Sequence, residues 1–157
     1  MAEAYPVWLK REPAHRLRQV GPNLFIGALD SPLATSRWAA VVDLYGSTLG
    51  QVRDGQHVVS GTAIPLLQIP FHDGSHFPPG AMDQISAFVR RHRQRGPVLI
   101  HCQAGLSRSA SAAAATLIRQ DRLLAREALR RVRAGAGRPD LPRRATLDSA
   151  LRWARNR

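Results

Sequence analysis

A short apolar segment, Pro97–Ile100, is followed by nine mostly polar or small residues, His101–Ser109 (HCQAGLSRS), and then by an alanine-rich run that ends at Gln120. The apolar segment has the length of a buried strand, and alanine has the highest helix propensity of all residues. The pattern predicts a strand that turns through a tight loop, residues 103–108, into a helix starting near Ser109. Such a unit restricts the chain to folds in which strands and helices pack in layers.

The rest of the chain alternates between the same two kinds of element. Apolar runs bounded by turn-forming residues predict strands at 23–27, 39–44 and 63–70, with a loop or weak hairpin at 46–61 and a loop at 71–80. Helical periodicity predicts helices within 31–38, 81–95, 123–134 and 146–155, with Leu124 facing inward. The alternation predicts one α/β domain, residues 21–157, with a central and mostly parallel sheet flanked by helices. Residues 1–20 are expected to form an irregular lead-in.

The composition is that of one ordinary globular domain of 157 residues. The chain has no apolar run of 18 residues and no apolar stretch near its start long enough for a signal peptide, so a cytoplasmic protein is expected. Its one cysteine, Cys102, cannot form an internal disulfide.

The net charge of +12 favours anionic partners such as phosphorylated molecules, nucleic acid or anionic lipid. The excess is almost entirely arginine, and codon composition explains it equally well. Four arginines near the C-terminus form either a rim for an anionic substrate or a solvated basic face: Arg133, Arg138, Arg143 and Arg144.

The loop after Cys102 has the properties of a phosphate socket. Gly105 permits backbone geometry that other residues resist, and successive N–H groups in such a loop can surround an anion. The start of the next helix adds free N–H groups and a positive dipole end, and Arg108 offers a planar pair of donors. These groups also stabilise a thiolate beneath them. A lone cysteine at a strand end is usually a buried hydrophobe, but this setting favours a nucleophile.

The stretch HCQAGLSRS resembles the signature H-C-x-x-G-x-x-R-[ST] of cysteine-dependent protein tyrosine phosphatases. Ala104 and Ser107 make it similar to the dual-specificity subgroup, in a compact and bacterial-type form. Weaker similarity in NLFIGALDSP, AAVVDLYG and EALRRVRAGAGRP extends the resemblance over roughly residues 20–155.

The resemblance implies a two-step phosphoryl transfer that needs no metal or cofactor. Cys102 would attack phosphorus and form a cysteinyl phosphate, Ser109 would steady the leaving thiolate, and His101 would brace the loop. A residue adjacent to Cys102 on a strand points to the opposite face, so His101 is not taken as the base. The phosphate would be held by Gln103, Ala104, Gly105, Leu106, Ser107 and Arg108.

Protonation of the leaving group requires an acid, which in this family is an aspartate upstream of the cysteine. Asp73 follows a predicted strand and lies 29 residues before Cys102, so it is the leading candidate, with a turn-forming role as the alternative. Asp83 competes with it but falls inside a predicted helix. His72 and His76 are expected to line the cleft or contact substrate, with proton donation as the chemical alternative.

The resemblance implies phosphoproteins as substrates, with phosphotyrosine first and phosphoserine or phosphothreonine after it, and phosphate, sulfate or vanadate as loop ligands. No membrane partner is expected. Two alternatives stay open: the same chemistry on RNA 5′ ends, phosphoinositides or phospho-sugars, or phosphate binding without turnover. Nucleic acid suits the charge but is the less favoured partner.

Overall fold

The computed structural model describes residues 17–46, 51–53, 55–59, 61–134 and 142–156. Seven strands form one sheet in the order β1-β2-β7-β3-β6-β5-β4. The strands are β1 (Arg18–Gly21), β2 (Leu24–Gly27), β3 (Ala40–Asp43), β4 (Gln51–Arg53), β5 (Gln56–Val59), β6 (Thr62–Gln68) and β7 (Val98–His101). The helices are the 3-10 helix η3 (Ser31–Ala34) and the α-helices α1 (Ala81–Arg93), α2 (Arg108–Gln120), α3 (Ala125–Arg133) and α4 (Arg144–Arg155).

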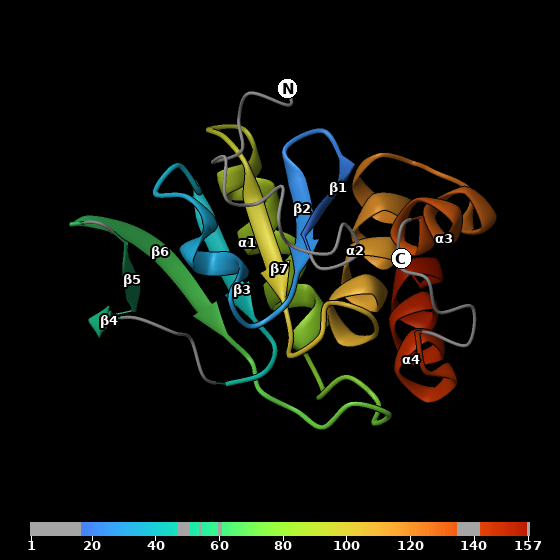
Figure 1. Cartoon of the computed structure of the whole chain (residues 1–157). Helices are drawn as coiled ribbons and strands as arrows, with labels where there is room; N and C mark the ends of the chain where they lie inside the picture. Colours follow the sequence, from blue (N-terminus) through green and yellow to red (C-terminus); the bar gives the residue numbers. More distant parts are fainter. Residues whose placement is uncertain (1–16, 47–50, 54, 60, 135–141, 157) are drawn as a thin grey trace.

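The four central strands, β2, β7, β3 and β6, run parallel, and β1, β5 and β4 are added antiparallel at the two edges (Figure 1). This confirms the predicted α/β domain with a mostly parallel centre. The parallel strands end at Gly27, His101, Asp43 and Gln68, so the segments that follow them all lie at the carboxyl end of the sheet. In open α/β sheets, ligands bind at the carboxyl ends of the strands.

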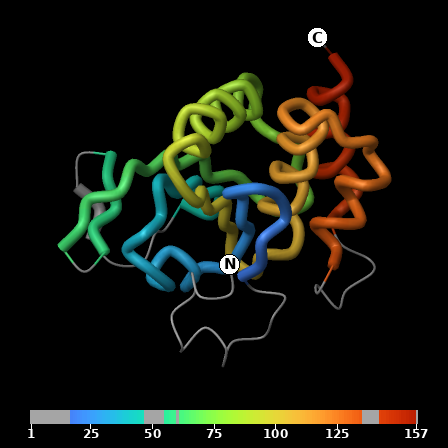
Figure 2. Tube along the Cα trace, turned by 90° about the horizontal axis from the view of Figure 1, so that it is seen from above, coloured from blue at the N-terminus to red at the C-terminus, as the bar shows by residue number. Residues whose placement is uncertain are grey.

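The two faces of the sheet are covered differently (Figure 2). One face carries α1 and α2, with α3 and α4 packed against α2, and its core includes Ile26, Val42 and Ile100. The core on the other face, where η3 lies, is smaller and contains Trp38 and Leu99. Alternating side chains of each short strand therefore enter two separate cores, as the period of two in a strand requires. Together the two cores bury every residue of β2, β3 and β7.

Two local predictions differ from the structure. Residues 18–20, expected in the irregular lead-in, belong to β1, which pairs with β2, and the buried Arg18 donates from Nη2 to the Val132 carbonyl at 2.8 Å. Residues 1–16 of that lead-in lie outside the described residues. Leu124, expected to face inward, is 63% exposed because it precedes the first turn of α3 in an extended conformation. A third local prediction, a loop or weak hairpin at 46–61, agrees with the structure, which has the antiparallel pair β4 and β5 in this segment.

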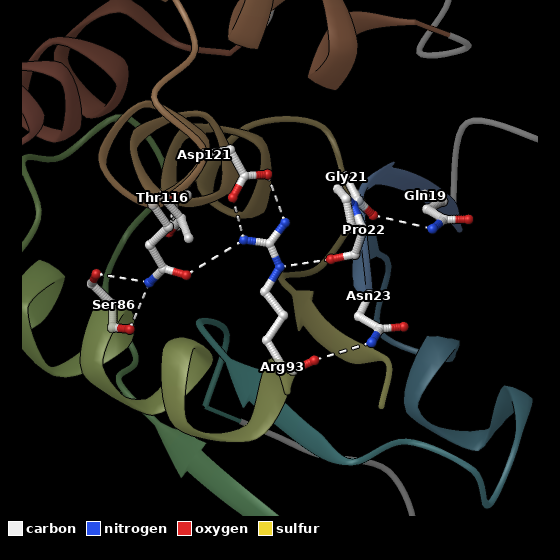
Figure 3. A network of polar contacts seen from close by, with 10 residues as sticks. Gln19, Gly21, Pro22, Asn23, Ser86, Arg93, Thr116 and Asp121 are labelled. Atoms are coloured by element: carbon white, nitrogen blue, oxygen red, sulfur yellow. Dashed lines mark hydrogen bonds and ion pairs between the residues drawn. The ribbon is translucent and has the colours of Figure 1, made fainter. Parts of the chain in front are cut away.

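A polar network joins the carboxyl ends of α1 and α2 to the β1–β2 turn (Figure 3). The guanidinium of Arg93 donates to both carboxylate oxygens of Asp121, at 2.7 and 2.8 Å, and to the Pro22 carbonyl at 2.6 Å. The network lies at the far end of α2 from Arg108, and 13 helical residues span roughly 20 Å. It fixes the helices at one end and leaves the other end to the functional site. No helix among the described residues is long and apolar enough to span a membrane.

Candidate active site

The loop between β7 and α2 begins beside the end of β2. The N–H of Cys102 donates to the Gly27 carbonyl at 3.3 Å, and the N–H of Leu29 donates to the Gln103 carbonyl at 3.0 Å. Gly105 has a φ of 75°, in the left-handed region that side-chain-bearing residues rarely adopt. The predicted strand, tight loop and helix are therefore all present, with the glycine at the turn.

The backbone of this loop offers unused donors. The N–H groups of residues 103–107 have no hydrogen-bond acceptor within the part of the chain that the structure describes. Gly105 and Ser107 are buried, and Gln103 and Ala104 are exposed. The amino end of α2 follows directly, and free N–H groups at a helix start attract an anion. The loop can therefore bind an oxyanion without any change in its internal hydrogen bonds.

Cys102 is 2% exposed and lies at the junction of β7 with the loop. Its Sγ atom is 3.3 Å from Oγ of Ser109, which is completely buried in the first turn of α2. The thiol is free, and Cys102 lines a pocket of about 190 Å³. The structure thus brings together the two residues that the sequence signature pairs.

Arg108 lies in the same pocket and is 7% exposed. Its Nη1 donates to the Phe71 carbonyl at 2.7 Å and makes a longer contact of 3.4 Å with the Leu44 carbonyl. Its guanidinium carbon lies 5.6 Å from the centre of the Tyr45 ring. Its Nε is buried without a hydrogen-bond partner among the described residues. Two carbonyls in the segments that follow β3 and β6 therefore fix the side chain, and one edge of its fork remains available.

His101 is completely buried behind the loop and does not line the pocket. Its Nδ1 lies 3.2 Å from the Cys102 carbonyl, and its Nε2 lies 3.6 Å from Oδ1 of Asp43. Since a carbonyl only accepts, Nδ1 is the donor in this contact. Burial lowers the pKa of His101, against the opposing effects of Asp43 and of the Cys102 contact, so the imidazole is neutral near pH 7. The ring therefore holds the start of the loop instead of moving protons at the pocket.

Asp73 also lines this pocket and belongs to the loop that follows β6. Its Oδ2 accepts a hydrogen bond from Nε of Arg143 at 3.0 Å, and its side chain is 33% exposed. The pocket is thus formed by three segments far apart in the sequence. Its lining residues are Asp73, Cys102, Gln103, Ala104, Leu106, Ser107, Arg108 and Arg143.

The Asp73 loop is held in place by the first turns of α4. Thr146 Oγ1 accepts from the Gly74 N–H at 3.1 Å and donates to the Ser75 carbonyl at 2.7 Å. The N–H of Phe77 donates to Ser149 Oγ at 3.0 Å. Together these bonds anchor a loop without regular secondary structure, so Asp73 is presented to the pocket from a defined backbone.

The other acid candidates lie outside the pocket. Asp83 falls within α1, as predicted, where it is exposed and accepts a hydrogen bond from Trp153 Nε1 at 2.8 Å. His72 is exposed and does not line the pocket. His76 is also exposed, with its Nδ1 3.3 Å from Nη2 of Arg152. Of the charged or titratable side chains proposed upstream of Cys102, only Asp73 meets the cysteine at one pocket.

The sequence left the roles of two contributors to this site, Asp43 and Arg143, unassigned. The Asp43 carboxylate accepts from the N–H groups of Tyr45 and Gly46 at 2.8 and 2.9 Å and from Gln68 Nε2 at 3.0 Å, so it organises the segment beneath Arg108. In the sequence, Arg143 was one of four arginines that could form either a rim for an anionic substrate or a solvated basic face. Of that group, Arg143 alone lines the pocket, and Arg138 lies outside the described residues.

Comparison with known families decides the assignment. The family described as dual specificity phosphatase, catalytic domain, matches residues 47–151. The chain belongs to this family. It is a cysteine-dependent phosphatase, in agreement with the resemblance of its signature. No curated protein sequence matches the phosphatase significantly.

Solved structures share the fold of the phosphatase. Human DUSP28 is 22% identical with a TM-score of 0.71, over 91% of this chain and 95% of that one. DUSP15 is 21% identical with a TM-score of 0.70, over 90% of this chain and 89% of that one. A cysteine-to-serine variant of P. aeruginosa TpbA, solved in complex with pTyr, is 21% identical with a TM-score of 0.64, over 92% and 85% of the two chains. At such identities the likeness establishes the common architecture.

Proposed function

We propose that the phosphatase hydrolyses phosphate monoesters on proteins, with phosphotyrosine as its first substrate, through a cysteinyl-phosphate intermediate and without a metal. The observation that carries this proposal is the meeting of Cys102, the unpartnered Nε of Arg108 and Asp73 at one pocket. A nucleophile, an anion clamp and a proton donor are the three groups that phosphoryl transfer to a thiolate requires. The catalytic unit is taken to begin at β1 and to include the rest of the described chain.

In the first step the Cys102 thiolate attacks phosphorus while the bond from phosphorus to the ester oxygen breaks. The leaving oxygen takes its proton from the Asp73 carboxyl, so a neutral phenol or alcohol departs. Arg108 and the N–H groups of residues 103–107 hold the equatorial oxygens, where charge is concentrated in the transition state. The products of this step are the dephosphorylated substrate and phosphorylated Cys102.

In the second step water attacks phosphorus and the bond from phosphorus to sulfur breaks. The Asp73 carboxylate accepts a proton from the water, and inorganic phosphate is formed. The Ser109 hydroxyl, 3.3 Å from Sγ, donates to the departing thiolate. His101 keeps the loop in position from behind. His72, exposed at the rim, is assigned at most a contact with the protein part of the substrate.

Anionic ligands of phosphate shape should occupy the same socket. A mouse dual specificity phosphatase has been solved with zinc tungstate, and the TpbA variant with pTyr. These findings on relatives of the same fold support phosphate, sulfate and vanadate as ligands here and an aryl phosphate as substrate. The free N–H groups of the loop give the physical basis for such binding.

The first test of the proposal is hydrolysis of p-nitrophenyl phosphate in the presence of EDTA. The purified chain should turn over the ester at an undiminished rate with the chelator, and it should also release phosphate from a phosphotyrosine peptide. A salt series distinguishes the substrate classes, because affinity for an RNA 5′ end falls more steeply with salt than affinity for a short peptide. A requirement for added divalent metal, or preference for the RNA, would contradict the proposal.

Asp73→Asn should affect substrates according to their leaving group. We expect kcat on a phosphotyrosine peptide to fall by about 10²-fold, since general acid catalysis typically contributes 10²–10⁴-fold. The loss on p-nitrophenyl phosphate should be no more than a few-fold, because nitrophenolate departs readily without a proton. Steady-state kinetics on both substrates measure the difference.

Asp83→Asn is the matched control, since it makes the same chemical change at an exposed aspartate outside the pocket. It should leave both rates near those of the wild type. Equal losses on the two substrates for Asp73→Asn would assign the proton donor to another residue.

A further inference from the structure

Arg143 lies where the phosphate loop, the Asp73 loop and α4 meet. It immediately precedes α4, and its own N–H donates to Ser107 Oγ at 3.0 Å while its carbonyl accepts from the Leu147 N–H at 3.0 Å. Its side chain passes Gly74, at which an added Cβ would come within 3.3 Å of Arg143 Cδ. The backbone of this residue is thus fixed by one hydrogen bond to Ser107 of the loop and by one to the first turn of α4.

The tip of Arg143 is much less constrained than its base. The side chain is 61% exposed, and Nε is engaged by Asp73 at 3.0 Å. Its two Nη groups have no acceptor among the described residues. A guanidinium presents five N–H donors in a fixed plane, so most of the donors of this pocket-lining residue have no partner within the described chain.

The pair between Arg143 and Asp73 also opposes the chemistry proposed for Asp73. Oδ2 of Asp73 accepts the hydrogen bond from Nε of Arg143 at 3.0 Å, so while the pair persists that oxygen is not free to meet a leaving group. An exposed ion pair is weak, typically below about 1 kcal/mol, so a second anion near the pocket can compete for the guanidinium. A phosphorylated substrate brings such charge to this point.

We propose that Arg143 is a specificity-determining residue that exchanges Asp73 for a second anionic group on the substrate, placed next to the phosphorylated residue. This inference rests on the proposed function and deepens it. The second group is a carboxylate or a further phosphate, since both match the guanidinium fork. Its binding draws Arg143 away from Asp73, whose carboxyl is then available for proton transfer. The substrate class is therefore a phosphopeptide with an acidic neighbour.

The test compares three phosphotyrosine peptides that differ only in the flanking residue: alanine, glutamate or phosphoserine. The wild type should show kcat/KM about 3- to 10-fold higher for the two acidic peptides than for the alanine peptide, the range expected of one exposed charge-assisted contact. The preference should shrink as salt is added. A larger preference for phosphoserine than for glutamate would identify the second phosphate as the better ligand.

Arg143→Gln should reduce that preference to about one, and Arg143→Lys should restore part of it, because lysine keeps the charge without the planar fork. Arg144→Gln is the matched control: it removes the same charge one position away, at an exposed residue that does not line the pocket. It should keep the wild-type preference. An equal loss in Arg143→Gln and Arg144→Gln would reduce the effect to general surface charge and overturn the proposal.

Asp73→Asn tests the exchange itself. With its competitor neutralised, Arg143 should bind the acidic neighbour more strongly, so the ratio of KM values between the alanine and glutamate peptides should increase about two- to threefold. An unchanged ratio would overturn the exchange. Failure of the wild type to hydrolyse any phosphotyrosine peptide or aryl phosphate would instead refute the proposed function, and equal hydrolysis of all three peptides would refute only the second-anion site.

Discussion

Replacing Cys102 with serine should lower kcat on p-nitrophenyl phosphate by about 10⁴-fold or more, the scale of losses seen when an enzyme loses its nucleophile. A serine hydroxyl at this position is un-ionised at neutral pH and is a far weaker nucleophile than a thiolate. The socket around it would be unaltered, because Arg108 and the loop N–H groups do not depend on sulfur. Activity should therefore vanish while phosphate binding persists. Initial rates and a phosphate titration measure the two properties separately.

Thermal unfolding provides the binding measurement for this variant. A ligand present at 100 times its Kd adds about 2.7 kcal/mol to the folded state, so phosphate should raise the Tm of Cys102→Ser as it does for the wild type. Ser111→Ala is the matched control, a small change at a completely buried residue of α2 that does not line the pocket, and it should remain active. Substantial turnover by Cys102→Ser would contradict a cysteinyl phosphate.

The phosphate loop could be predicted from the sequence because its chemistry is local. Cys102, Gly105 and Arg108 lie within seven consecutive residues, and their roles follow from one strand end, one turn and one helix start. The central strands could also be predicted from the sequence, since a parallel strand buried on both faces appears as a continuous apolar run such as AAVVDL. In both cases adjacent residues carry the information.

Elements that depend on distant contacts were harder to predict. Strand β1 has no apolar alternation, because it is an edge strand whose Arg18 finds its partner at Val132, 114 residues away. The pair between Asp73 and Arg143 spans 70 residues and lies where α4 anchors the Asp73 loop. A family resemblance could indicate Asp73, but four similar arginines offered no sequence signal for the one that meets it. Only tertiary packing determines which of the four arginines contacts Asp73.

Arg108→Lys should lower kcat by about 10²- to 10³-fold, the cost of losing one preorganised donor to a developing oxyanion. Lysine retains the positive charge, but it cannot present two parallel donors to two phosphate oxygens. It would also lose the contacts from Nη1 to the carbonyls of Phe71 and Leu44, which tie the residue to the start of the Asp73 loop. The transition state should therefore suffer more than substrate binding, with kcat reduced more than KM is raised.

The leaving group separates this prediction from the one for Asp73. Since Arg108 holds the transferred phosphoryl group itself, Arg108→Lys should slow p-nitrophenyl phosphate and phosphotyrosine by similar factors. Arg126→Lys, at an exposed position on α3 outside the pocket, is the matched control and should leave both rates unchanged. A loss of less than tenfold for Arg108→Lys would mean that charge alone suffices at this position and that the buried, unpartnered Nε is not a phosphate ligand.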